Sequence, residues 1–143
     1  MKVNFAHLCD YANITADGKV NIMGLFTHIF GVKLPFIHLR AHLVFEIELH
    51  YTEVGTPFDV QLECVDADGN NLMRGKTQIT VQGVGKPGDR PIVPQVLTLP
   101  PLKFVKPGPH DLNIFLGPRS GASISLSFEV TELPQAPPQL PAT

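Results

Sequence analysis

The residues best suited to chemistry in this sequence are three aspartates in polar turns, Asp17, Asp66 and Asp68. Carboxylate oxygens are the ligands that Ca²⁺ prefers, and loops at one end of a β-sandwich can bring such groups together. An EF-hand is excluded, because positions six and twelve counted from Asp66 hold Asn71 and Thr77 instead of glycine and glutamate. The sequence therefore predicts either ordinary turns or a calcium site formed by convergence of the three carboxylates.

A second candidate lies on one face of a predicted strand, where His42, Glu46, Glu48 and His50 share a side. Residues two apart on a strand are neighbours, so Glu48 and His50 are the closest pair that could share a metal ion. Only one strand contributes, and Val44 lies among the four residues. A solvated polar face is therefore the favoured interpretation.

Three further residues, His110, Asp111 and Ser120, have the types of a serine nucleophile with its base and orienting acid. The surrounding segment 117–121 is one residue out of register with the G-x-S-x-G elbow. It also lacks the strand-to-helix setting that this elbow requires. The sequence thus predicts no serine hydrolase, and an enzyme only if other residues converge in three dimensions.

The segment 82–94 is rich in glycine and proline and contains the letters G-x-G-x-x-G. In a dinucleotide site such glycines open a helix, which the prolines of this segment prevent. A phosphate loop is excluded as well, because Pro87 instead of serine or threonine follows Lys86. The segment is predicted to be a long irregular loop, a kind that is often functional. Its candidate binding residues are Gly83, Gly85, Lys86, Gly88 and Arg90.

The elements that carry these residues are predicted to be strands. Between residues 40 and 51 apolar side chains alternate with polar ones at a period of two, which a helix would not maintain. The chain also has 14 prolines, 12 glycines and only 17% charged residues, a composition that suits short strands and many turns. The predicted strands are 2–12, 19–30, 40–51, 58–64, 72–81, 95–99, 110–116 and 123–131.

About eight strands with turns every ten residues predict an all-β fold, an antiparallel β-sandwich formed by residues 1–132. Immunoglobulin-like, C2-like and jelly-roll arrangements all fit this rhythm. Within the strand 19–30, Gly24 indicates a bulge or a close backbone approach. The proline-rich segment 133–143 is predicted to be an extended or disordered tail.

Charge and hydropathy narrow the classes of partner. The net charge is −2, and the eleven basic residues are scattered, so the basic stripe of a nucleic-acid-binding protein is missing. No apolar stretch approaches the length of a membrane span, and the first residues contain no apolar signal region. We therefore expect a cytoplasmic protein with no nucleic-acid or membrane partner and no cofactor. Cys9 and Cys64 are expected to be buried, reduced thiols.

The opening of the chain, residues 4–12 followed by 18–26, carries the pattern C-D-Y-A … G-K … I-x-G. It resembles a family of small, uncharacterised bacterial proteins, and residues 102–116 and the last strand are similar to that family as well. The resemblance implies a β-sandwich and a bacterial setting. It implies no activity and no functional residue.

These observations predict a non-enzymatic binding or scaffolding module with another protein as its partner. The loop 82–94 and the tail 133–143, which holds two P-x-x-P motifs, are the expected contact segments. Self-association through an exposed sheet edge is also expected. The alternative is a sandwich that binds a small ligand, calcium or carbohydrate, or an enzyme whose site forms only in three dimensions.

Overall fold

The computed structural model describes residues 1–117 and 122–134. Within these residues there is no α-helix, and the single helical turn is a 3₁₀ turn, η1 (Tyr51–Glu53). The predicted all-β class is therefore confirmed. The strands are β1 (Lys2–Ile14), β2 (Val20–Leu25), β3 (His28–Gly31), β4 (Phe36–His38), β5 (His42–Glu48), β6 (Phe58–Asp66), β7 (Asn71–Ile79), β8 (Ile92–Thr98), β9 (Leu102–Phe104), β10 (Gly108–Leu116) and β11 (Ser123–Glu132).

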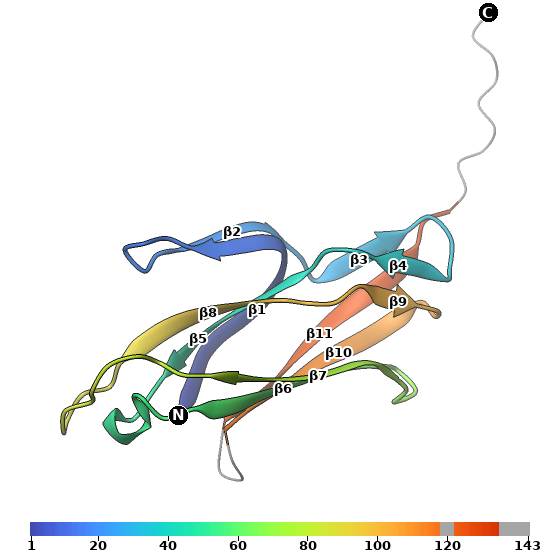
Figure 1. Cartoon of the computed structure of the whole chain (residues 1–143). Coiled ribbons are helices and arrows are strands. Elements are labelled where there is room, and N and C mark those ends of the chain that lie inside the picture. Colours follow the sequence, from blue (N-terminus) through green and yellow to red (C-terminus); the bar gives the residue numbers. More distant parts are fainter. Residues whose placement is uncertain (118–121, 135–143) are drawn as a thin grey trace, which may run out of the picture.

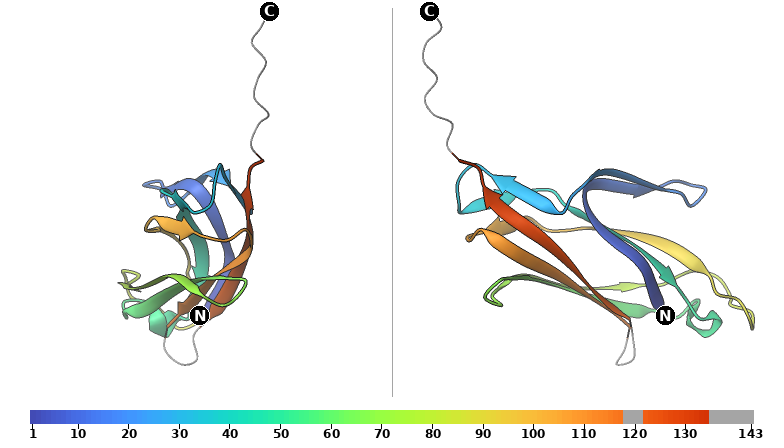
Figure 2. Two further views of the ribbon diagram at one scale, coloured as in Figure 1. Left: turned by 90° about the vertical axis from the view of Figure 1, so that its right-hand side faces the viewer. Right: turned by 180° about the vertical axis from the view of Figure 1, so that it is seen from behind.

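The strands form two layers packed face to face (Figures 1 and 2). One sheet has the order β2-β1-β5-β8, and the other has the order β3-β11-β10-β6-β7. The short pair β4–β9 continues the β5–β8 pairing, because His42 lies opposite Thr98 and His38 lies opposite Leu102 in the same register. The ladder is interrupted at 100–101, two prolines that have no N–H to donate.

The strand order decides between the arrangements that the sequence leaves open. All strand pairs are antiparallel except β3 with β11, which is parallel. The order β1-β5-β8 corresponds to strands A-B-E of an immunoglobulin-type sandwich, and β11-β10-β6 corresponds to its strands G-F-C. The connectivity thus favours the immunoglobulin-like arrangement, with β2 added at the edge.

The strand predicted at 19–30 is two strands in two different sheets, β2 and β3, so that prediction was wrong. Apolar residues continue on both sides of the crossing at residues 26–27, so the composition of the segment did not separate the two strands. The expected close approach at Gly24 is confirmed: its φ is +67°, and a Cβ there would lie 2.4 Å from the Asp10 carboxylate. Only glycine adopts this conformation at low cost.

The irregular loop is shorter than predicted, because β8 begins at Ile92 and includes Pro94. The amide of Leu49 donates to the carbonyl of Pro91 (2.9 Å), so odd-numbered residues of β8 carry the bonds to β5. Even-numbered positions then face the open edge of the sheet. Pro94 is tolerated at such a position because no ladder bond needs its missing N–H.

The main core lies between the two sheets. From β5 it receives Leu43, Phe45 and Ile47, all fully buried, as their alternation predicts. A second cluster lies on the opposite face of β5, where Val44 is also fully buried and packs with Cys9 and Ala12. The β1–β2 hairpin folds over this face (Figure 2), so the face predicted to be solvated is partly covered.

Both cysteines are free and buried, as predicted. Burial raises the pKa of the Cys64 thiol to about 12, and the nearby carboxylates of Asp111 and Asp66 add to the effect. A thiol in this state is a poor nucleophile. In the described part of the chain, no helix is long and apolar enough to cross a membrane.

Candidate functional site

The loop 82–91 connects β7 in one sheet to β8 in the other and lies at the end of the sandwich beside η1 (Figure 1). Main-chain hydrogen bonds fix both of its ends. The amide of Gly55 donates to the carbonyl of Val81 (2.8 Å), and the amide of Leu49 donates to that of Pro91 (2.9 Å). The loop is therefore attached to the segment 49–55, which precedes it by about thirty residues.

The backbone geometry of this loop requires glycine at the three positions that match the G-x-G-x-x-G pattern. A Cβ on Gly85 would lie 2.0 Å from the carbonyl oxygen of Tyr51, so only glycine permits the contact. Gly83 and Gly88 have φ values of +122° and +92°, which other residues rarely adopt. The segment leads into the strand β8 instead of a helix.

A hollow of about 490 Å³ lies between this loop and the start of β8. Its apolar walls include Val54, Val81 and Val93, which come from three separate segments. Val84 is 90% exposed at the loop, and the side chain of Arg90 is 77% exposed. The hollow thus combines apolar walls with two charged residues: Arg90, which solvent can reach, and Asp89, whose carboxylate accepts from the Lys86 amide.

Of the five binding residues predicted in the loop, Gly83, Gly85 and Arg90 line the hollow, whereas Lys86 and Gly88 do not. The Lys86 amide instead donates to the Asp89 carboxylate (3.1 Å) and closes a turn at the loop tip. Sequence reasoning missed the valine walls from segments outside the loop. No local signal identifies them, because the sequence pattern around a strand valine is the same whether that valine lines a hollow or faces the core.

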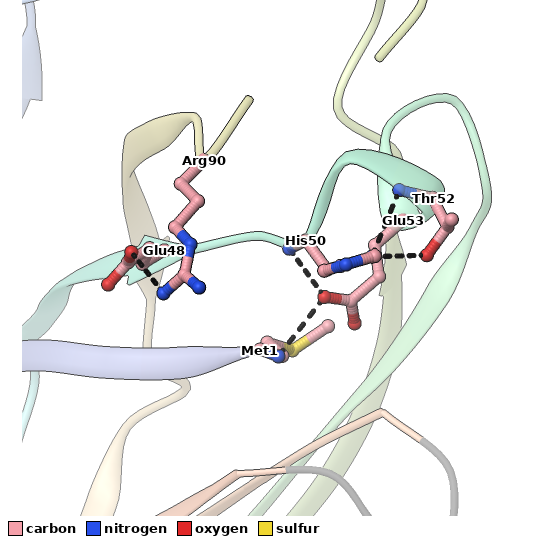
Figure 3. A network of polar contacts seen from close by, with 6 residues as sticks. All are labelled: Met1, Glu48, His50, Thr52, Glu53 and Arg90. Atoms are coloured by element: carbon pink, nitrogen blue, oxygen red, sulfur yellow. Dashed lines mark hydrogen bonds and ion pairs between the residues drawn. The ribbon is translucent and has the colours of Figure 1, made fainter. Parts of the chain in front are cut away.

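A smaller hollow of about 180 Å³ adjoins the first and shares Arg90 with it. Figure 3 shows the polar groups around it. The Arg90 guanidinium lies 3.9 Å from the Glu48 carboxylate, a long contact that leaves it accessible. The Glu53 carboxylate accepts from the His50 amide (2.8 Å) and lies 3.1 Å from the Met1 amino nitrogen. Glu53 is therefore occupied in holding the turn, while Arg90 remains able to bind an anionic group.

The three aspartates considered as calcium ligands do not converge. Asp17 lies in the β1–β2 turn, and Asp66 and Asp68 lie in the β6–β7 turn at the opposite end of the molecule (Figure 1). Asp17 pairs with Lys19 (3.3 Å), and Asp68 pairs with Lys106. In the described residues, no group of three His, Cys, Asp or Glu side chains could hold a metal ion.

The Asp66 carboxylate has a structural use in its turn. Its Oδ1 accepts from the amides of Asn70 and Asp68, both at 2.9 Å, and its Oδ2 accepts from the Asn70 side chain (3.3 Å). These bonds, the Asn70 amide foremost, hold the pKa of the Asp66 carboxyl below its usual range. They account for this aspartate without a ligand.

The lowered pKa predicts how stability depends on pH. The ionised Asp66 stabilises the fold above the pKa of aspartate in the unfolded chain, about 3.9, and this contribution is lost as pH falls through the lower folded-state pKa. We expect the melting temperature to decline in acid more steeply for the wild-type chain than for Asp66→Asn. Thermal melts between pH 7 and pH 2 test this, and parallel declines would contradict it.

The polar residues proposed to share a metal on β5 have other partners. His42 Nδ1 lies 2.9 Å from the Asp10 carbonyl oxygen, and Glu46 accepts from the Asn4 side chain (3.1 Å). Of the four, only Glu48 and His50 line a common hollow, the smaller one, where Arg90 also lies. The strand face therefore contributes to the loop end of the sandwich through its last residues alone.

Of the serine-nucleophile residues, the two that the structure describes, His110 and Asp111, are not brought together. His110 is buried in the core, stacked on Phe128, and its Nδ1 lies 2.9 Å from the Gly108 carbonyl oxygen. Asp111 points to the opposite face of β10 and accepts from the Ser127 hydroxyl (2.6 Å). Ser120 lies outside the described residues. A buried imidazole cannot act on a substrate in solvent.

Comparison with known proteins gives one result. Residues 4–129, most of the chain, match a family described as a family of unknown function (DUF6941). No curated protein and no solved structure matches the chain. The resemblance to an uncharacterised family, inferred from the opening of the sequence, is thereby confirmed, and the chain belongs to the DUF6941 family.

Proposed function

We propose that this protein is a non-enzymatic binding module and that it holds a segment of another protein in the hollow beneath the loop 82–91. The observation that carries the proposal is the hollow of about 490 Å³ with valine walls and an accessible arginine at its rim. Binding sites are commonly concave and mostly apolar, with a few polar groups that fix the orientation of the ligand.

The chemistry of the hollow indicates what it would accept. Val54, Val81 and Val93 offer apolar contact, and Arg90 offers up to five N–H donors to a carboxylate. An apolar side chain contacts the valines, and an acidic group next to it pairs with Arg90 where it is held away from the Asp89 carboxylate, which also lines the hollow. The backbone contact at Gly85 fixes the loop before binding, which reduces the entropy that the ligand must overcome.

Affinity capture with designed variants tests this proposal. Baits of the full chain, Val84→Asp and Arg90→Glu would be incubated with lysate of a bacterial host that encodes the protein. We expect a partner that the wild-type bait retains and both variants lose, because an acidic side chain in the hollow repels an acidic ligand and is costly beside an apolar one.

Phe115→Asp is the matched control, because Phe115 is 43% exposed on the outer face of β10 and does not line this hollow. This bait should retain the partner. A bait that ends at Glu132 separates the hollow from the proline-rich tail, which lies almost wholly outside the described residues. A partner lost only from the truncated bait, or retained by Val84→Asp and Arg90→Glu, would contradict the proposal.

We also propose a cytoplasmic location in a bacterial cell for this binding module. Two free, buried thiols suit a compartment in which disulfides do not form, which supports a cytoplasmic location. The bacterial origin rests on the resemblance of the opening sequence.

If the hollow takes a small anionic ligand instead of a protein segment, a thermal-shift screen of apolar carboxylates would detect it and the same two variants would abolish the shift.

A further inference from the structure

Within the described residues the two large sheets have four edge strands, β2, β8, β3 and β7, and these differ in how they are protected against pairing with another chain. Exposed edges are usually protected by charged side chains or proline. In one sheet the edge strand β8 contains Pro94, and in the other sheet the edge strand β7 carries Arg74 and Lys76. The other two edges, β2 and β3, contain neither a proline nor an Asp, Glu, Lys or Arg.

These two unprotected edges are continuous with each other. β2 leads into β3 through residues 26–27 alone, and the two strands follow one another along the same side of the molecule (Figures 1 and 2). β2 borders one sheet and β3 borders the other. The unprotected edge therefore extends along both layers of the sandwich.

Apolar side chains are concentrated around this edge. Tyr11 and Met23 lie opposite each other on the hairpin and are 48% and 65% exposed, and Phe30 on β3 is 59% exposed. Of the fourteen large apolar side chains exposed in the described residues, nine lie between residues 11 and 39. They are Tyr11, Ile14, Ile22, Met23, Leu25, Phe30, Val32, Ile37 and Leu39.

The area of this surface can be compared with what a stable dimer needs. At roughly 200 Å² for a fully exposed large side chain, the nine side chains at about half exposure together present roughly 1,000 Å², distributed over both faces of the β1–β2 hairpin and over residues 30–39. One partner of a standard interface contributes about 800 Å². We propose that a second copy of this chain covers this surface, with β2 pairing antiparallel to β2 about a two-fold axis.

The hydrogen-bonding geometry of β2 supports this pairing. The Thr15 amide donates to the Lys19 carbonyl (2.8 Å), so near the turn the odd-numbered residues carry the β1–β2 bonds. The main-chain groups of Val20 and Ile22 then face the open edge. A second β2 offers the same groups in the reverse direction, as a two-fold interface requires.

In two-fold pairing, each side chain of the edge strand lies near its equivalent in the second copy. A strand without charged residues is therefore suited to pair with its own copy. Like charges opposite each other destabilise a strand pair, so a charged edge strand would disfavour its own copy. β2 carries no charge and offers Met23 and Leu25, which are 65% and 53% exposed. The edge strand β7 would instead oppose its own Arg74 and Lys76 in such a pair.

The test is the mass of the full chain in solution, measured by sedimentation at several concentrations. The wild-type chain should have twice the monomer mass of 15.6 kDa. Met23→Lys adds a charge that opposes its copy, and Ile22→Pro removes an edge N–H while leaving the β1–β2 bonds in place. Both variants should be monomers with wild-type circular dichroism, and Phe115→Lys, which adds a charge elsewhere, should remain a dimer.

Several outcomes would overturn the proposal. One is a wild-type chain that stays monomeric up to hundreds of micromolar, which would leave a different protein as the partner of this edge. Another is a dimer that persists in both folded edge variants. A dimer that Phe115→Lys dissociates, while Met23→Lys does not, would place the interface on another face. None of these results depends on the hollow beneath the loop 82–91.

Discussion

Replacement of Phe104 by alanine is expected to lower the free energy of unfolding by about 3–5 kcal/mol, the usual cost of removing a buried aromatic ring. Phe104 is fully buried in β9, and its ring centre lies 5.5 Å from that of Phe36, 5.2 Å from that of His110 and 6.0 Å from that of Phe128. These rings come from separate strands, so the cavity would affect both layers. A domain of this size has a total stability of only about 5–15 kcal/mol.

Urea unfolding at neutral pH, followed by circular dichroism, measures this effect. The matched control is Phe115→Ala, which removes the same ring from a side chain that is 43% exposed on the outer face of β10. We expect the control to lower stability less than Phe104→Ala does, because 43% of Phe115 is already exposed to solvent and its removal leaves no enclosed cavity. A Phe104→Ala variant as stable as the control would contradict the placement of this ring in the core.

The second large effect is expected for Gly85→Ala, which should lower the free energy of unfolding by about 1–3 kcal/mol, the usual cost of steric overpacking. The new Cβ would lie 2.0 Å from the Tyr51 carbonyl oxygen. This neighbour is backbone and cannot rotate away. The loop must therefore move away from η1, and the hollow that it forms with Val54 should change shape.

The chain offers a matched control in Gly75→Ala. Neither glycine has a positive φ, and a Cβ on Gly75 would meet nothing closer than the Met73 sulfur at 3.9 Å. The control should be neutral or slightly stabilising, because alanine reduces the freedom of the unfolded chain. Denaturant unfolding of both variants gives the comparison, and equal stability would show that the loop does not rest on Tyr51.

Gly85→Ala also separates two explanations for binding at the loop. If a partner enters a preformed hollow, the variant should lose affinity while Arg90 remains in place. If the partner contacts only the exposed tip, where Lys86 and Asp89 form a turn, affinity should be retained. Capture with the Gly85→Ala and Gly75→Ala baits would distinguish these outcomes.

The sequence by itself determined those features that depend on residues close together in the chain. The alternation of Leu43, Phe45 and Ile47 predicted a strand and its buried face, because successive side chains of a strand point to opposite sides. The hairpin turns at 17–18 and 66–71 followed from their glycines and aspartates, whose conformational preferences are local. The family resemblance was likewise carried by a continuous opening segment.

Only the tertiary structure decided how those elements are combined. It divided the predicted strand 19–30 between two sheets, covered Val44 with the β1–β2 hairpin, and placed Asp17 at the opposite end from Asp66. It also placed Gly85 against Tyr51 and so formed the hollow. Each of these results depends on contacts between residues far apart in the chain. Such contacts form only when the two sheets pack, and no pattern within one strand specifies which distant strand will cover it.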